Sequence, residues 1–79
     1  MDRIQIADIE KWREKIAGVM EDLEAVDDKS EEMLNNMKAY VSDSKFFQEK
    51  GDLVRSFEAI IWAWAIYETC KEFSLFINR

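Results

Sequence analysis

The chain contains no proline and only two glycines, Gly18 and Gly51, among its 79 residues. Proline interrupts helices and glycine weakens them, so a chain almost free of both can form long, unbroken helices. The length allows one small domain and leaves no room for a cofactor domain beside a substrate domain. We therefore expect an all-α fold whose few turns fall at polar breaks in the sequence.

Apolar residues recur at alternating steps of three and four, the spacing of one helical face. This pattern predicts helices at about residues 3–26, 29–49 and 53–77 within a single domain, 1–79. The first helix carries an apolar stripe of Ile9, Trp12, Ile16, Val19, Leu23 and Val26. The second carries Met33, Met37, Tyr40, Ser44 and Phe47. Because the connections are short, consecutive helices should lie antiparallel, which gives an up-down-up three-helix bundle.

Two polar breaks separate the predicted helices. At the second break, Gly51 favours a left-handed helix end, and Asp52 is a suitable N-cap for the third helix. At the first break, Asp28 is followed three residues later by Glu31, which is the spacing of a capping box. These residues predict where the second and third helices begin.

The predicted third helix is apolar around most of its circumference. One stripe comprises Leu53, Phe57, Ile60, Trp64 and Tyr67, and a second comprises Ala59, Trp62, Ala63, Ile66, Cys70, Phe73 and Ile77. Trp62 lies roughly 160° from Trp64 around the helix. Either the first helix covers Trp62, or the face with Trp62 and Phe73 is exposed and marks an interface. The candidate interface residues are Trp62, Ile66, Phe73 and Arg55.

Eleven basic residues against seventeen acidic ones give the chain a net charge of −6. An acidic chain does not attract phosphate backbones or anionic lipids, so neither nucleic acid nor a membrane is an expected partner. The most suggestive polar cluster flanks the turn between Lys50 and Arg55, and the helix N-terminus there is suited to a small anion or a peptide. The cluster comprises Asp43, Lys45, Lys50, Asp52, Arg55 and Glu58. The competing interpretation of that turn is a capped helix end with surface ion pairs.

The residues of most catalytic and metal sites are missing. Histidine is absent, which excludes histidine triads and histidine metal ligands. No glycine-rich phosphate loop exists, and we predict no enzymatic activity, no catalytic or metal-binding residues and no cofactor. The single cysteine, Cys70, cannot form an internal disulfide and is expected to be a small buried apolar residue. The longest apolar run, Ala59 to Tyr67, is too short to cross a membrane, and no signal sequence is visible, so we expect a cytoplasmic protein.

The second break and its flanks resemble a known family. Its pattern is an aspartate and an aromatic residue before a Gly-Asp turn, then an alanine, an isoleucine and an aromatic-alanine pair. In this chain the matching residues are Asp43, Phe47, Gly51, Asp52, Ala59, Ile60, Trp62 and Ala63. The stretch from about residue 33 to 70 is similar to domain-of-unknown-function family 357, small proteins mainly of archaea. The resemblance implies a compact three-helix bundle and no particular activity.

Two functions are consistent with these observations. The leading hypothesis is a non-enzymatic interaction or adaptor module that uses the third helix to bind a second copy of the chain or another protein. The alternative is an accessory factor that contacts an anionic ligand or nucleic acid through the turn between Lys50 and Arg55. The sequence does not name the partner in either case.

Overall fold

Three long helices and two short strands make up the chain. The computed structural model describes residues 4–78, so the predicted helix start at residue 3 lies outside the described part. The elements in chain order are α1 (Ile6–Glu21), β1 (Leu23–Ala25), α2 (Asp28–Glu49), α3 (Leu53–Glu72) and β2 (Phe76–Asn78).

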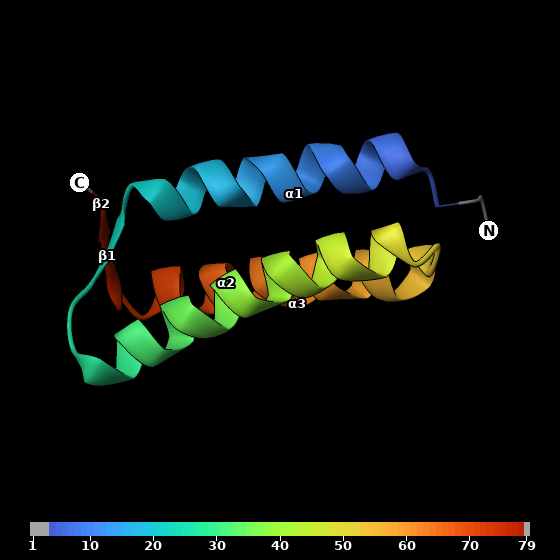
Figure 1. The fold of residues 1–79 in the computed structure, drawn as a ribbon. Helices are drawn as coiled ribbons and strands as arrows, with labels where there is room; N and C mark the ends of the chain where they lie inside the picture. Colours follow the sequence, from blue (N-terminus) through green and yellow to red (C-terminus); the bar gives the residue numbers. More distant parts are fainter. Residues whose placement is uncertain (1–3, 79) are drawn as a thin grey trace.

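The helices pack as the up-down-up bundle that the sequence predicts (Figure 1). α1 and α3 run in the same direction, and α2 runs against both. The most extensive contact is between α2 and α3. The bundle measures 37 × 19 × 19 Å, with the two strands side by side at one end and the α2–α3 turn at the other (Figure 1).

The turn between α2 and α3 forms as predicted around Gly51, which has a φ of 80°. The N–H of Gly51 donates to the carbonyl of Gln48 (3.0 Å), and the N–H of Asp52 donates to the carbonyl of Phe47 (2.9 Å). These two bonds are a Schellman motif, which satisfies carbonyls at a helix end. Glycine is favoured at this position because it has no Cβ to clash in the left-handed region.

α3 ends at Glu72, not at residue 77 as predicted, because a second Schellman motif stops it. Ser74 takes a left-handed φ of 56°. Its N–H donates to the carbonyl of Lys71 (3.1 Å), while the N–H of Leu75 donates to the carbonyl of Cys70 (2.9 Å). A serine therefore stands where glycine is usual, and neither glycine nor proline marks this helix end in the sequence.

β1 and β2 form a small antiparallel sheet where the first and third helices were predicted to continue. Leu23 lies opposite Asn78, and Ala25 lies opposite Phe76. α1 therefore ends at Glu21 rather than at residue 26. Leu23 remains buried, as predicted, but a strand and not a helix carries it into the core. The sheet joins the connection after α1 to the C-terminal end of the described chain.

The N-cap of α2 is Asp27, one residue before the predicted Asp28. The N–H of Ser30 donates to Asp27 Oδ1 (2.8 Å), and the N–H of Asp27 donates to Ser30 Oγ (3.0 Å). This reciprocal pair is a capping box with serine in place of the glutamate that the sequence suggested. Ser30 is fully buried, so its position is tied to the packing of the turn as well as to the cap.

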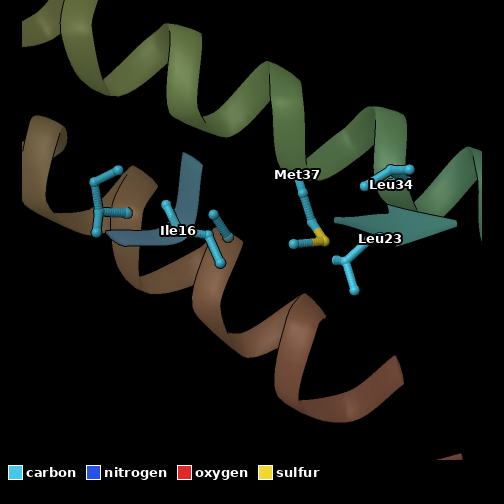
Figure 2. Close-up of a cluster of buried hydrophobic side chains, with 6 residues drawn as sticks. Ile16, Leu23, Leu34 and Met37 are labelled. Carbon is cyan, nitrogen blue, oxygen red and sulfur yellow. The ribbon is translucent and has the colours of Figure 1, made fainter. Parts of the chain in front are cut away.

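The hydrophobic core lies between the three helices and β1. Its central cluster comprises Ile16, Leu23, Leu34, Met37, Ile60 and Ala63. Met37 extends from α2 toward Leu23 and Ile16 (Figure 2). Two residues predicted for the core are largely exposed: Trp12 at 41% and Val26 at 44%. Trp12 lies at the edge of α1 that faces α3, and Val26 lies beyond the end of the helix that was to bury it.

A chain of hydrogen bonds between buried serines joins the helices beside this core. The Ser56 hydroxyl donates to the Ser44 carbonyl (2.7 Å), so the proton between the two hydroxyls (3.1 Å) comes from Ser44. Ser44 Oγ in turn accepts a hydrogen bond from Arg13 Nη1 (3.2 Å). Arg13 thereby connects α1 to α2. Both serines are fully buried, and each bond has one consistent donor.

Removing one hydroxyl from this chain should destabilise the bundle. Ser56→Ala leaves Ser44 without its buried acceptor, and the expected cost is about 1–3 kcal/mol in the free energy of unfolding. Ser42→Ala, at an exposed position of α2, is the control and should change stability little. Urea unfolding followed by circular dichroism measures both. Equal stabilities of the two variants would contradict this account of the serine chain.

The cap of α2 predicts a dependence of stability on acid pH. Hydrogen bonds from the Ser30 N–H and hydroxyl hold the pKa of Asp27 below its ordinary value of 3.8. A lowered folded-state pKa contributes stability that is present above the unfolded value and is lost as pH falls through the folded value. Asp27→Asn still accepts the cap hydrogen bond but does not titrate. The variant should therefore lose less stability than the wild type below about pH 4. Urea unfolding at a series of pH values measures the free energy of unfolding of both proteins. If the two values fall in parallel as the pH is lowered, Asp27 does not have this role.

Candidate functional site

α3 has two aromatic edges, because two neighbouring helices cannot cover all of its apolar circumference. Trp62 lies on the edge toward α2, where its ring stacks on Tyr40 with centroids 6.5 Å apart and planes at 21°. Trp64 lies on the edge toward α1, where it meets Trp12 edge to face at 5.9 Å. Trp62 remains 57% exposed. Of the two alternatives drawn from the sequence, the structure therefore shows the exposed one.

Trp62 and Tyr40 form part of an open cleft of about 300 Å³ between α2 and α3. Its lining residues are Tyr40, Asp43, Phe47, Arg55, Glu58, Ala59 and Trp62. The cleft thus combines three aromatic rings with one guanidinium and two carboxylates. We call it the Tyr40–Trp62 cleft. Apolar pockets with a few charged groups at the rim are typical of sites that receive a side chain from a partner.

Arg55 is held at the rim of this cleft by two neighbours. Its guanidinium carbon lies 5.8 Å from the centroid of the Phe47 ring, and its Nε lies 3.6 Å from Asp52 Oδ2. Asp52 is the N-cap of α3, as predicted, and accepts the backbone N–H of Arg55 (3.0 Å). The same carboxylate therefore caps the helix and neutralises part of the Arg55 charge. Lys50 lies apart from the pair, with its ammonium group 5.5 Å from the Phe46 ring.

The structure brings together two of the four candidate interface residues. Arg55 and Trp62 both line the Tyr40–Trp62 cleft. Ile66 is partly buried and packs against the central core cluster, so it supports the helix from inside. Phe73 is 69% exposed as the C-cap of α3, and it does not line the cleft. The helical spacing placed Trp62, Ile66 and Phe73 on one stripe, but in the structure Ile66 packs on the core and Phe73 lies outside the cleft.

A second apolar groove lies between α1 and α3, where the sequence analysis expected core. We call it the Trp12–Ile61 groove; it has a volume of about 210 Å³ and is lined by Trp12, Phe57, Ile60, Ile61 and Trp64. Ile61 is 50% exposed and belonged to neither predicted stripe. It follows Phe57 by four residues and precedes Trp64 by three, so helical spacing places it beside the first stripe, and this was its signal in the sequence.

Metal ligands, the cysteine thiol and apolar helices are the remaining features of residues 4–78 that bear on function. Within residues 4–78, no group of three or more cysteine, aspartate or glutamate side chains is arranged to hold a metal ion. Cys70 is 3% exposed, and burial raises the pKa of its thiol above the ordinary 9.0. None of the described helices is both long and apolar enough to cross a membrane. The features that stand out are two surface cavities rich in aromatic residues.

The buried thiol predicts slow chemical modification. Because the thiolate is the reactive form, a raised pKa and exclusion of reagent both slow the reaction of Cys70 with Ellman's reagent. Near neutral pH the native protein should react at least about 100-fold more slowly than the urea-unfolded chain, since reaction requires local opening. The unfolded sample is the internal control. Similar rates in both states would show that Cys70 is accessible.

The fold and the two cavities define a class: a small three-helix bundle, tied at one end by a two-stranded sheet, with aromatic side chains displayed on both edges of its last helix. The chain belongs to the DUF357 family, described as "Protein of unknown function", whose model matches residues 7–76. Among solved structures, it is similar to the crystal structure of protein AF1782 from Archaeoglobus fulgidus. The two share 38% identity and a TM-score of 0.82, over 92% of this chain and 91% of that one. Among curated proteins, no sequence matches the chain.

Proposed function

We propose that the protein is a non-enzymatic interaction module that binds a protein partner at the Tyr40–Trp62 cleft. The observation that carries the proposal is the half-exposed stack of Trp62 on Tyr40 inside a cavity with charged groups at its rim. Leaving a tryptophan in water costs free energy that burial by a partner recovers. Tryptophan, tyrosine and arginine are the residues that most often dominate binding energy, and all three line this one cleft.

The charges at the rim favour a partner that presents a basic side chain. Asp43 and Glu58 supply two carboxylates, while the guanidinium of Arg55 is partly neutralised by Asp52. Cations are attracted to the faces of tryptophan and tyrosine, and the carboxylates add direct ion pairs. The net charge of −6 also favours encounter with a basic surface. A lysine or arginine from the partner would then extend along the aromatic rings toward the two acids.

The anionic-ligand alternative has less support. The N-terminus of α3, which would attract an anion, already receives the carboxylate of Asp52. Arg55 is engaged with that carboxylate, and Lys50 lies over the Phe46 ring. An incoming anion would have to displace Asp52 or approach an acidic molecule against its overall field. We therefore take the cleft, and not the turn, as the functional surface.

A peptide titration tests the chemistry of the cleft. We expect a short peptide with a central lysine to shift the indole N–H resonance of Trp62 with about millimolar affinity. The same peptide with norleucine, which has no charge, should bind more weakly. Trp62→Ala should abolish the shifts of neighbouring amide signals, whereas Ile61→Ala should preserve them, because Ile61 lies at the other edge of α3. Equal binding of both peptides would reject the basic-partner chemistry.

Affinity capture from the source organism tests the wider role. Proteins that co-purify with the wild type and with Ile61→Ala, but not with Trp62→Ala, are the expected partners. If capture depends on Trp62 but the peptide titration shows no preference for lysine, the cleft still binds a protein partner, but the partner does not present a basic side chain there. A partner retained equally by all three forms would contradict the use of the cleft.

A further inference from the structure

The chain exposes more surface than a folded monomer of its size usually does. Its accessible surface is 5605 Å², whereas a 9.4 kDa monomer typically exposes roughly 5000 Å². The excess is of the same order as the ~800 Å² that each partner buries in a standard protein interface. The exposed large apolar residues are Ile6, Trp12, Val26, Phe46, Val54, Ile61, Trp62, Phe73 and Ile77. They lie on more than one face, so the Tyr40–Trp62 cleft does not account for them all.

The Trp12–Ile61 groove differs in character from the Tyr40–Trp62 cleft. All of its lining residues are apolar or aromatic, and no charged side chain is among them. Val54, which is 60% exposed, precedes Ile61 by two helical turns and extends the same row along α3. A continuous apolar face of this kind resembles the core of a permanent interface, not the charged pocket of a transient one.

Two lysines on α1 and two glutamates on α3 flank the groove. Lys11 and Lys15 on α1 place their ammonium groups 5.8 and 4.8 Å from the Trp12 ring. On α3, Glu68 and Glu72 follow Ile61 on the exposed side. The two lysines nearest the Trp12 ring therefore stand across the groove from two glutamates, with Asp8 one turn before Trp12 and Lys71 over the Tyr67 ring as the other charges nearby. A face with this pattern is complementary to itself when it is turned by a twofold axis.

We propose that the Trp12–Ile61 groove is the interface of a homodimer, in which α1 of each copy packs against α3 of the other. Because α1 and α3 run parallel, a twofold axis along the bundle brings these helices together in parallel (Figure 1). The contact between Trp12 and Trp64 fixes the relative height of the two helices. Lys15 lies one turn beyond Trp12, and Glu68 lies one turn beyond Trp64, so Lys15 of one copy meets Glu68 of the other.

Sedimentation equilibrium on two neighbouring variants tests which edge of α3 is used. Ile61 and Trp62 are similarly exposed, at 50% and 57%, but lie on opposite edges. The wild type should be a dimer at about 0.1 mM. Ile61→Glu should raise the dimer dissociation constant by at least about 100-fold, because a charge would be buried in each half of the interface. Trp62→Glu should leave it within about threefold. A monomeric wild type, or a dimer lost in Trp62→Glu and kept in Ile61→Glu, would overturn the proposal.

Charge exchange between two variants tests the arrangement. Lys15→Glu and Glu68→Lys should each weaken the homodimer, because each places like charges opposite one another at both symmetry-related contacts. An equimolar mixture of the two variants should form a heterodimer at close to wild-type strength, since both contacts are then between opposite charges. Circular dichroism confirms that each variant is folded. If the mixture associates no better than either variant alone, the pairing of α1 with α3 is wrong.

Discussion

The contact between Ser44 and Ser56 is the constraint on which the arrangement of α2 and α3 depends. Both side chains are fully buried, and their hydroxyls can be satisfied only by each other, by the Ser44 carbonyl and by Arg13. Small side chains at the crossing allow the two helices to approach closely. The polar chain also specifies register, because sliding either helix would leave buried hydroxyls unpaired at a cost of about 1–3 kcal/mol each. Arg13 extends this constraint to α1.

That close α2–α3 contact determines what remains exposed. With Ser56, Ala59 and Ala63 turned into the bundle, α3 directs Trp62 and Trp64 to the two edges of the contact. α2 offers Tyr40 to one edge, and α1 offers Trp12 to the other. Each neighbour covers only part of the edge that it meets. The half-exposed aromatic residues, and the two cavities that they line, therefore result from how the core is packed.

The sequence predicts the parts of the fold that follow from side-chain chemistry at one position. Gly51 marks its helix end because glycine favours the left-handed region that the motif requires. Ser74 ends α3 by the same hydrogen bonds, but serine carries no such signal, and the strand at Phe76–Asn78 was therefore missed. Strands of three residues are too short to show a period of two, and β1 forms only because β2 is available to pair with it.

The candidate site, like the fold, could be predicted from the sequence only in part. The possible exposure of Trp62 followed from helical spacing, which left open whether the first helix covers this residue. The Trp12–Ile61 groove did not, because Trp12 fits a core stripe as well as an edge. Which aromatic residues share a cavity depends on the distances between helices, and these are determined by the buried serines. A pattern along one helix does not contain that information.

The Tyr40–Trp62 cleft and the Trp12–Ile61 groove lie on opposite edges of α3, so binding at one would not obstruct the other. A dimer built through the groove between α1 and α3 would leave both Tyr40–Trp62 cleft surfaces uncovered, one on each copy. A partner with two basic segments at a suitable spacing would then engage both clefts, and the second contact would form at a high effective concentration. Weak binding at each cleft is compatible with tight binding by the pair. Such a dimer would give a chain of this size a way to bind selectively without a large pocket of its own.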